Sequence, residues 1–270
     1  MKLLFLGTGA AGSIKTPNAE MQPGRRRCAS MMMNDTVVVD IALQSFDYAT
    51  ELGKDTSAVT DIFLSHTHGD HYCKATLLQY AAVAKQKINF WCHETAIPYL
   101  HLTEEESALI HLCPLQSMQI VEAAGMKVTV LPANHVAGPK EQPVHYIFEK
   151  DEHVLFYGCD GGWFRCETWQ YLYRKRIAFT AMILDATVGE LPGNFRIGEH
   201  NTIPMLRLMK TAMLENGILP FKATLIANHV GVPPYDLLQK NDYGLLTELG
   251  MIVAEDGMEL NLSALSPKTV

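Results

Sequence analysis

Apolar and polar positions follow two patterns along the chain, and these patterns predict strands and helices. Short runs rich in β-branched and aromatic residues predict strands at Leu3–Leu6, Thr36–Val39, Ile62–Leu64, Lys127–Leu131, His145–Phe148, Val154–Tyr157, Met182–Leu184 and Thr224–Ala227. Helical patterns bounded by Gly, Pro or polar cap residues occur at Ala42–Glu51, Lys74–Ala84, Trp163–Arg174, Ile203–Asn216 and Tyr235–Lys240. Paired strands followed by single helices favour an α+β fold of two mixed sheets covered by helices.

The length and composition predict a single globular domain that spans residues 1–270. No Pro/Gly/Ser-rich or charged linker divides the chain, which is 48% hydrophobic and 19% charged. No apolar run reaches the roughly 18 residues of a membrane span. The apolar run "LLFL" near the N-terminus is shorter than the core of a signal peptide, so we expect no membrane partner and interpret this run as the first strand.

The six cysteines bear on the expected cellular location of the protein, and the net charge bears on the class of partner that it could bind. The cysteines form no C-x-x-C pair and resemble ordinary thiols of a reducing compartment, which predicts a cytoplasmic protein. A net charge of −7 and a pI near 5.9 argue against nucleic acid as a partner, because nucleic-acid binding rests on basic contacts to phosphates. The expected partner is a small molecule, and an anionic one must be held locally, most obviously by metal.

A glycine-rich stretch after the first predicted strand offers a competing interpretation. Gly7, Gly9 and Gly12 in "GTGAAG" satisfy the G-x-G-x-x-G pattern of dinucleotide sites, and Asp35 and Asp40 lie downstream like the acidic residue of such a site. That fingerprint places pyrophosphate on a helix N-terminus, yet the following "SIKTPNAEMQPGRRR" contains two prolines and no apolar helical period. The glycines therefore indicate a sharp turn after the strand.

A dense cluster of metal-binding residue types lies in "SHTHGDHYC". It places His66, His68, Asp70 and His71 within six residues, and Gly69 suggests a tight turn. Histidine and aspartate supply the nitrogen and oxygen donors that divalent transition metals bind, so the stretch predicts a metal site.

Four isolated residues further along complete a candidate constellation. They are His135 in "LPANHVAG", Asp160 in "FYGCDGG", His200 in "GEHNT" and His229 in "LIANHVG". Three of them follow apolar runs typical of strands. Because strand ends can present polar groups to one shared cleft, a metal site assembled from several of these segments is physically sensible.

These motifs resemble a known family. "HTHGDH" resembles the H-x-H-x-D-H signature of the metallo-β-lactamase fold, a four-layer αβ/βα sandwich, and the later residues follow in the family's order. Within that fold, "LDAT", "GEHNT" and "ANHVGVPPYD" resemble the phosphodiesterase branch, which includes tRNase Z and the cyclic phosphodiesterases of phosphonate breakdown. The chain departs from both, because it has no basic insertion like the tRNA-gripping arm and only Cys28 where the phosphonate enzymes bind a structural zinc.

The resemblance implies a two-metal hydrolase. It implies one metal bound by His66, His68 and His135, a second bound by Asp70, His71 and His229, and a bridge through Asp160. Two such ions share a hydroxide and act as Lewis acids in metal-assisted hydrolysis. Ligands of the His and carboxylate types without a thiolate favour zinc and admit manganese or iron.

Further residues take roles outside the ligand set by the same resemblance. His200 would face the leaving group and Asp185, in "LDAT", would orient it, while Asp70 counts as both catalytic residue and ligand. The simpler alternative for the pair is a surface histidine and a turn-capping aspartate. Asp40 would brace the metal-binding loop. The run Arg25–Arg27 has the composition of a solvated charge cluster, with substrate phosphate as the alternative contact.

The function expected from these residues is hydrolysis of a small phosphodiester or cyclic phosphate. The alternatives are a lactone, thioester or β-lactam hydrolase that uses the same metals, or a metal-bearing binding protein without turnover. The sequence leaves open the substrate, the native metal and the oligomeric state, including a homodimer.

Overall fold

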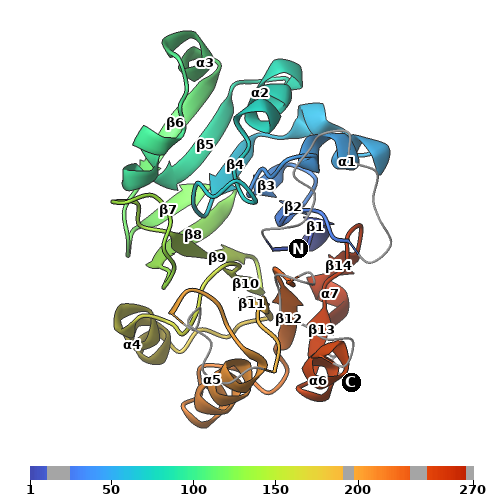
Figure 1. The fold of residues 1–270 in the computed structure, drawn as a ribbon, viewed down its shortest axis with the longest axis vertical. Coiled ribbons are helices and arrows are strands. Elements are labelled where there is room, and N and C mark those ends of the chain that lie inside the picture. The colour runs from blue at the N-terminus through green and yellow to red at the C-terminus, as the bar shows by residue number, and fades with distance from the viewer. Residues whose placement is uncertain (11–24, 191–197, 232–241, 266–270) are drawn as a thin grey trace.

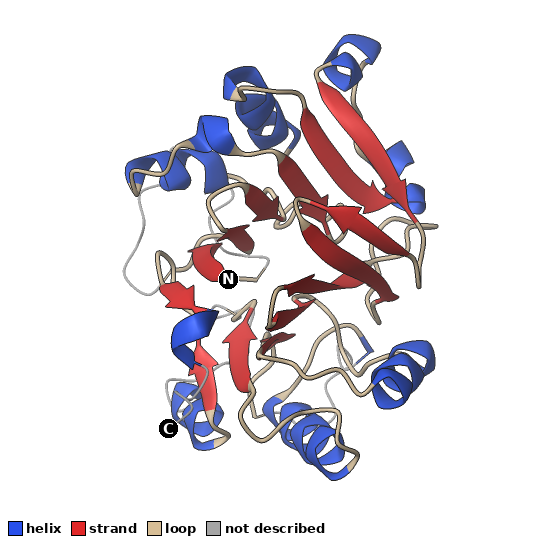
Figure 2. Cartoon of the chain, turned by 180° about the vertical axis from the view of Figure 1, so that it is seen from behind, coloured by secondary structure: helices blue, strands red, loops and turns tan. Residues whose placement is uncertain are grey.

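The computed structural model describes residues 1–10, 25–190, 198–231 and 242–265. Two seven-stranded sheets pack against each other, and helices lie on their outer sides (Figures 1 and 2). The arrangement confirms the predicted α+β sandwich of four layers. Among the described residues, no helix is long and apolar enough to cross a membrane.

The first sheet holds the N-terminal strands and has the order β14-β1-β2-β3-β4-β5-β6. Its strands are β1 (Lys2–Gly7), β2 (Ser30–Met33), β3 (Val37–Val39), β4 (Asp61–Leu64), β5 (Ile88–His93), β6 (Ile110–Leu115) and β14 (Glu259–Asn261). Strands β3 to β6 run parallel to one another. Their carboxyl ends therefore lie at one edge of the sheet.

The second sheet has the order β13-β12-β11-β10-β9-β8-β7. Its strands are β7 (Ile120–Ala123), β8 (Met126–Pro132), β9 (Val144–Lys150), β10 (His153–Gly158), β11 (Ala181–Asp185), β12 (Thr224–Asn228) and β13 (Met251–Val253). Strand β9 is antiparallel to both β8 and β10, whereas β10 to β13 are parallel. The carboxyl ends of β8, β10, β11 and β12 consequently share one edge.

The helices divide between the two outer faces. Those of the N-terminal half are α1 (Ser45–Glu51), α2 (Lys74–Val83), α3 (Glu104–Ala108) and the 3-10 helices η1 (Thr56–Ala58) and η2 (Glu94–Tyr99). Those of the C-terminal half are α4 (Cys166–Lys175), α5 (Ile203–Glu215), α6 (Asp242–Glu248) and α7 (Leu262–Leu265). Helix α5 begins where the Thr202 hydroxyl accepts a hydrogen bond from the Met205 amide, as an N-cap does.

Three apolar clusters correspond to the three interfaces between the layers. Side chains from both sheets, such as Phe63 and Phe148, form the central cluster. A second cluster joins α1 and α2 to the first sheet through residues such as Tyr80, and a third joins α4, α5 and α6 to the second sheet through residues such as Met209. The packed sheets therefore hold the loops at their carboxyl edges in fixed positions.

Each strand predicted from the sequence is present, but several others were not predicted. The missed strands are β2, β5, β6, β7, β13 and β14. Strand β2 reads "SMMM", which has little intrinsic strand preference, yet all four residues are buried, so tertiary packing determines its conformation. Helices α1 and α4 each begin three residues later than predicted, at Ser45 and Cys166. The predicted helix Tyr235–Lys240 lies outside the described residues.

Candidate metal centre

The candidate ligands follow the carboxyl ends of strands from both sheets. Residues His66 to His71 follow β4 of the first sheet. His135 follows β8, Asp160 follows β10 and His229 follows β12 of the second sheet. Because the carboxyl ends of each sheet share an edge, segments far apart in sequence meet where the two edges face each other.

Three aspartate and histidine residues at these strand ends have a left-handed backbone. The φ angles of Asp40, Asp160 and His229 are 58°, 60° and 53°. Non-glycine residues adopt this region at a cost and are enriched at functional sites. The conformation turns the chain sharply after the strand, which directs each side chain toward the shared edge.

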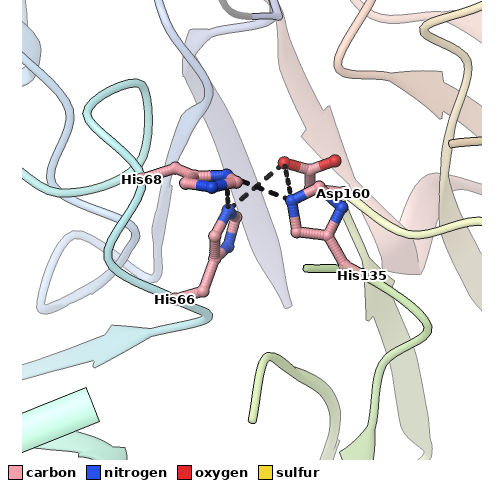
Figure 3. A group of neighbouring side chains, drawn as sticks. All are labelled: His66, His68, His135 and Asp160. Atoms are coloured by element: carbon pink, nitrogen blue, oxygen red, sulfur yellow. Dashed lines mark hydrogen bonds and ion pairs between the residues drawn. The ribbon is translucent and has the colours of Figure 1, made fainter. Parts of the chain in front are cut away.

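A first group consists of His66, His68, His135 and Asp160, whose donor atoms converge on one point (Figure 3). Nδ1 of His68 lies 3.0 Å from Nε2 of His66 and 3.1 Å from Nε2 of His135. Oδ2 of Asp160 lies 3.3 Å from each of the same two Nε2 atoms. Four donors around a tetrahedral zinc ion at about 2.1 Å stand about 3.4 Å apart, so the group fits such an ion with small adjustments.

A second group consists of Asp70, His71, Asp160 and His229. Oδ2 of Asp160 lies 3.2 Å from Nε2 of His71 and 3.6 Å from Nε2 of His229, which itself lies 3.3 Å from Oδ2 of Asp70. The same Asp160 oxygen therefore belongs to both groups. One oxygen that faces both groups could contact an ion in each of them.

The outer ring nitrogens of four histidines are already occupied by hydrogen bonds. Each Nδ1 lies within 2.7–3.0 Å of an oxygen outside the two groups: Ser65 Oγ for His66, Asp40 Oδ2 for His71, Glu199 O for His135 and Thr187 Oγ1 for His229. Such a partner fixes the tautomer with the proton on Nδ1. In all four rings, Nε2 is therefore the nitrogen that faces the group and could bind a metal ion.

Asp40 makes the contacts that were expected of a brace. Its buried carboxylate accepts hydrogen bonds from the Ser65 amide at 2.7 Å and the Ser65 hydroxyl at 2.9 Å. It also contacts His71 Nδ1 at 2.8 Å and the Tyr157 hydroxyl at 3.0 Å. The carboxylate thus holds the start and the end of the histidine-rich loop to the second sheet.

His200 and Asp185 form the predicted pair and add a contact that was not predicted. Nδ1 of His200 lies 3.0 Å from Oδ2 of Asp185 and 2.8 Å from Oδ1 of Asp160. The other Asp185 oxygen accepts hydrogen bonds from the amides of Asn201 and Thr187 at 2.9 and 3.0 Å. His200 is largely buried and so is not a surface histidine, whereas Asp185 caps the turn at Thr187 and contacts His200 as well.

The buried charges divide the site into two electrostatic halves. Burial lowers the pKa of His66 and of His135 to about 4, so these rings are neutral near pH 7. Burial also opposes the charged forms of His200 and His229, but nearby carboxylates outweigh it and raise their pKa values to about 11 and about 9. The neutral rings of His66 and His135 could therefore accept a cation directly, whereas His229 holds a proton that a cation would have to displace.

The arginine run is more structural than predicted. Arg26 donates hydrogen bonds to the Thr8 hydroxyl and the Ala254 carbonyl, at 2.6 and 2.5 Å. The Arg27 guanidinium stacks on the Tyr48 ring at 3.5 Å from its centre, and its side chain is 17% exposed. A solvated charge cluster is therefore the wrong description, because these guanidinium groups fasten segments of the chain to each other. A contact with substrate phosphate stays a prediction.

The first glycines of "GTGAAG" allow close approach of neighbouring backbone. A side chain at Gly7 would overlap the Cys28 carbonyl. The Gly9 amide donates to the Arg27 carbonyl at 2.7 Å, and Gly9 forms a bridge to Val230, which follows His229. These glycines thus support the metal-binding edge, while Gly12 lies outside the described residues.

Sequence reasoning missed Thr187 and Ser65, which contact the ligands from behind. Thr187 stands two residues after Asp185, and Ser65 immediately precedes His66. A hydroxyl next to a candidate ligand is a weak signal, because Ser and Thr are common at strand ends. Their contacts therefore became evident only from the fold.

A family model described as the beta-lactamase superfamily domain matches residues 35–212. The matched span includes the histidine-rich loop, His135, Asp160, Asp185 and His200, and ends before His229. No curated protein matches the chain.

Several solved structures share the fold at low sequence identity. A new diphosphatase from the PhnP family is 17% identical, with a TM-score of 0.70 and coverage of 96% of each chain. Human tRNase Z, short form, is 15% identical with a TM-score of 0.64, covering 97% of this chain and 99% of its own. Unliganded yeast PDE1 is 13% identical with a TM-score of 0.68, covering 96% and 99%. At these identities, the likeness establishes the fold.

Proposed function

The chain belongs to the beta-lactamase superfamily domain family, and from this premise we propose that it is a metal-dependent hydrolase of small phosphodiesters or cyclic phosphates. His66, His68 and His135 would hold one divalent metal ion, and Asp70, His71 and His229 would hold the second. Asp160 would contact both ions. Zinc fits this set of nitrogen and oxygen donors, and manganese or iron are the alternatives.

The observation that carries this proposal is the His200 imidazole beside the two metal groups. Its Nδ1 faces Asp185 and Asp160 at 3.0 and 2.8 Å, and their charges raise its pKa to about 11 against the opposing effect of burial. Both contacts use Nδ1, so within the described part of the chain Nε2 is the nitrogen that can face a substrate. At neutral pH this ring is a cation with a proton to donate.

The proposed reaction is the attack of water on phosphorus. The ions, when bound, would act as Lewis acids that stabilise the developing negative charge. The bond between phosphorus and the leaving oxygen breaks, and the His200 imidazolium supplies a proton from Nε2 to that oxygen. The proton lost by the attacking water restores the imidazolium, so the charges balance. Asp185 accepts the hydrogen bond from Nδ1–H throughout, and Asp160 lies beside the same nitrogen as an ion-pair partner, which fixes the ring orientation.

Proteins of similar fold include a diphosphatase and a tRNase, which supports chemistry at phosphorus for this chain. The net charge of −7 is unfavourable for binding a large polyanion, which supports a small substrate.

The decisive experiment is elemental analysis followed by a substrate screen. We expect close to two metal ions per chain and turnover of bis(p-nitrophenyl) phosphate or a cyclic nucleotide. Preferential turnover of a lactone or thioester would replace the proposed substrate class. Bound metal without any turnover would favour a binding protein, and failure to bind zinc or manganese would remove the basis of the proposal.

A further inference from the structure

Glu141 connects the loop that carries His135 to the loop that carries His66 and His68. Its Oε1 accepts a hydrogen bond from the Thr67 amide at 2.7 Å, and its Oε2 accepts one from the Thr67 hydroxyl at 2.5 Å. Thr67 is the residue between the two histidines. The two bonds to Thr67 therefore fix the backbone between His66 and His68.

The loop that bears Glu141 is itself fixed in place. Oε2 of Glu141 accepts a bond from the Gly138 amide at 3.1 Å, and the Glu141 amide donates to the Gly138 carbonyl at 2.9 Å. The Tyr99 ring covers Gly138 so closely that a Cβ there would lie 2.6 Å from a ring carbon, and the Tyr99 hydroxyl accepts a bond from the Lys140 amide at 3.2 Å. Glu141 therefore projects from a rigid support, against which Thr67 is held.

We propose that Glu141 is a positioning residue that sets the geometry of the first metal group. Its carboxylate accepts two hydrogen bonds from Thr67 and one from Gly138, which tie the His66–His68 segment to the segment that follows His135 and so help to hold the three histidines in register. The inference rests on the proposed function, in that this group binds a metal ion. Hydrogen bonds that orient metal ligands commonly affect metal affinity, and Glu141 would act one step further out, through Thr67 between the two histidines.

The second group has different supports, so the effect should be selective. His71 is held by Asp40 at 2.8 Å and His229 by Thr187 at 2.7 Å. A negative charge at position 141 would attract both ions and would act on both groups. If Glu141 instead positions the ligands, its substitution should change the zinc affinity of the first group alone. This difference separates positioning from simple electrostatics.

Zinc affinity measured in two backgrounds tests the proposal. His229→Ala leaves the first group intact and His135→Ala leaves the second, and in each a chromogenic chelator competes with the protein for Zn²⁺. Glu141→Gln keeps the size of the side chain but cannot accept bonds from Thr67 and Gly138 with both terminal atoms. We expect it to weaken binding in the His229→Ala background by about 10- to 100-fold and to leave the His135→Ala background unchanged.

A matched control is Glu149→Gln, because Glu149 is paired with Lys127 at 2.8 Å on a surface strand position. It should change neither affinity. Thr67→Val provides a second variant, which removes the hydroxyl but keeps the amide donor. It should weaken zinc binding to the first group to a smaller extent. Its effect should not add to that of Glu141→Gln, because both variants affect the same contact between Thr67 and Glu141.

Equal losses in both backgrounds, or no loss in either, would overturn the proposal. If Glu141→Gln does not fold, Thr67→Val decides, and unchanged zinc affinity at the first group would count against the role of Glu141. A wild-type protein that takes up no zinc would overturn the proposed function together with this inference. If the wild-type protein binds two zinc ions but Glu141→Gln leaves the zinc affinity of the first group unchanged, only the inference about Glu141 is overturned.

Discussion

The Thr187 hydroxyl lies 2.7 Å from Nδ1 of His229 and 2.9 Å from Oδ2 of Asp185. It accepts the proton of the histidine and donates its own to the aspartate, so one side chain joins a candidate metal ligand to the residue that orients His200. The second metal group and the proposed proton donor thus share a support.

Replacing Thr187 with valine tests that support, because valine has nearly the same shape and no hydroxyl. We expect Thr187→Val to weaken zinc binding in the His135→Ala background by about 10- to 100-fold and to lower turnover. Thr211→Val is the matched control, since the Thr211 hydroxyl donates to the carbonyl of Arg207 on the exposed side of α5. Chelator competition measures the affinities. Equal behaviour of the two variants would show that the Thr187 hydroxyl does not support the ligand.

The number of metal ions provides a second prediction. The two groups share Asp160 and otherwise use separate histidines, so the wild-type protein should hold close to two ions per chain. Removal of one group by His135→Ala or by His229→Ala should leave close to one ion. Plasma emission spectrometry on dialysed protein measures this. A count of one in the wild type, unchanged in one of the variants, would contradict the two-group interpretation.

Substitution of Asp160 tests the bridge. Asp160→Ala should abolish nearly all activity and lower metal content, because one oxygen serves both groups. Asp160→Asn is the informative partner, since asparagine tolerates the positive φ of 60° better than most non-glycine residues do, which separates loss of charge from loss of backbone conformation. Arg26→Ala, which removes hydrogen bonds to Thr8 and Ala254 but no candidate ligand, should cost less activity. Normal turnover with two ions bound to Asp160→Ala would disprove the bridging role.

The two groups should differ in how their affinity depends on pH. Burial lowers the pKa of His66 and His135 to about 4, so zinc displaces no proton from them near pH 7. Carboxylates raise the pKa of His229 to about 9 despite burial, and zinc must displace that proton from Nε2.

Carboxylates, Asp40 first among them, also raise the pKa of His71 well above its ordinary value despite burial. Affinity of the second group should therefore rise with pH above pH 7 by about tenfold per pH unit for each proton displaced, whereas the first group should change little. Calorimetric titrations of the two single-group variants in buffers with different ionisation enthalpies count the released protons. Equal proton release from both groups would contradict this assignment of charges.

The sequence was most informative where the ligands are close together. The run "HTHGDH" contains four candidate ligands within six residues, so chance spacing was a poor explanation and the loop could be recognised alone. His135, Asp160 and His229 follow apolar strands, and the family resemblance linked them. The supports were harder to find, because Glu141 and Thr67 stand 74 positions apart and Thr187 and His229 stand 42 apart. No local pattern encodes such contacts.

The fold shows the same limit. Strand β1 has the apolar composition of a buried strand, and its prediction was confirmed. Strand β2 consists of Ser30 and three methionines and is recognisable only because β1 and β3 pair with it on either side. The extra contact between His200 and Asp160 could not be expected either, since it depends on how the segment after β11 returns toward β10.

The His200 substitution separates a proton donor from a metal ligand. The proposal requires that His200→Ala keep both metal ions while turnover falls by roughly 100- to 10,000-fold, the usual contribution of a general acid. The alternative is realistic, because Asp160, Asp185, His200 and His229 lie close enough together to hold an ion themselves. Metal analysis of the variant distinguishes the two, since loss of an ion would make His200 a ligand.

Leaving-group dependence completes the argument about His200. A nitrophenolate is a weak base that hardly needs a proton as its bond to phosphorus breaks, whereas an alkoxide needs one, so the loss in His200→Ala should be small for nitrophenyl esters and large for alkyl esters. Asp185→Asn should show the same trend with a smaller loss, because it removes one of two carboxylates that hold Nδ1 and leaves Asp160 in place at 2.8 Å. Steady-state rates over a series of phosphodiesters with graded leaving groups measure both effects. Equal losses across the series would mean that His200 delivers no proton to the leaving oxygen, and hydrolysis of a lactone or thioester would then become the stronger hypothesis.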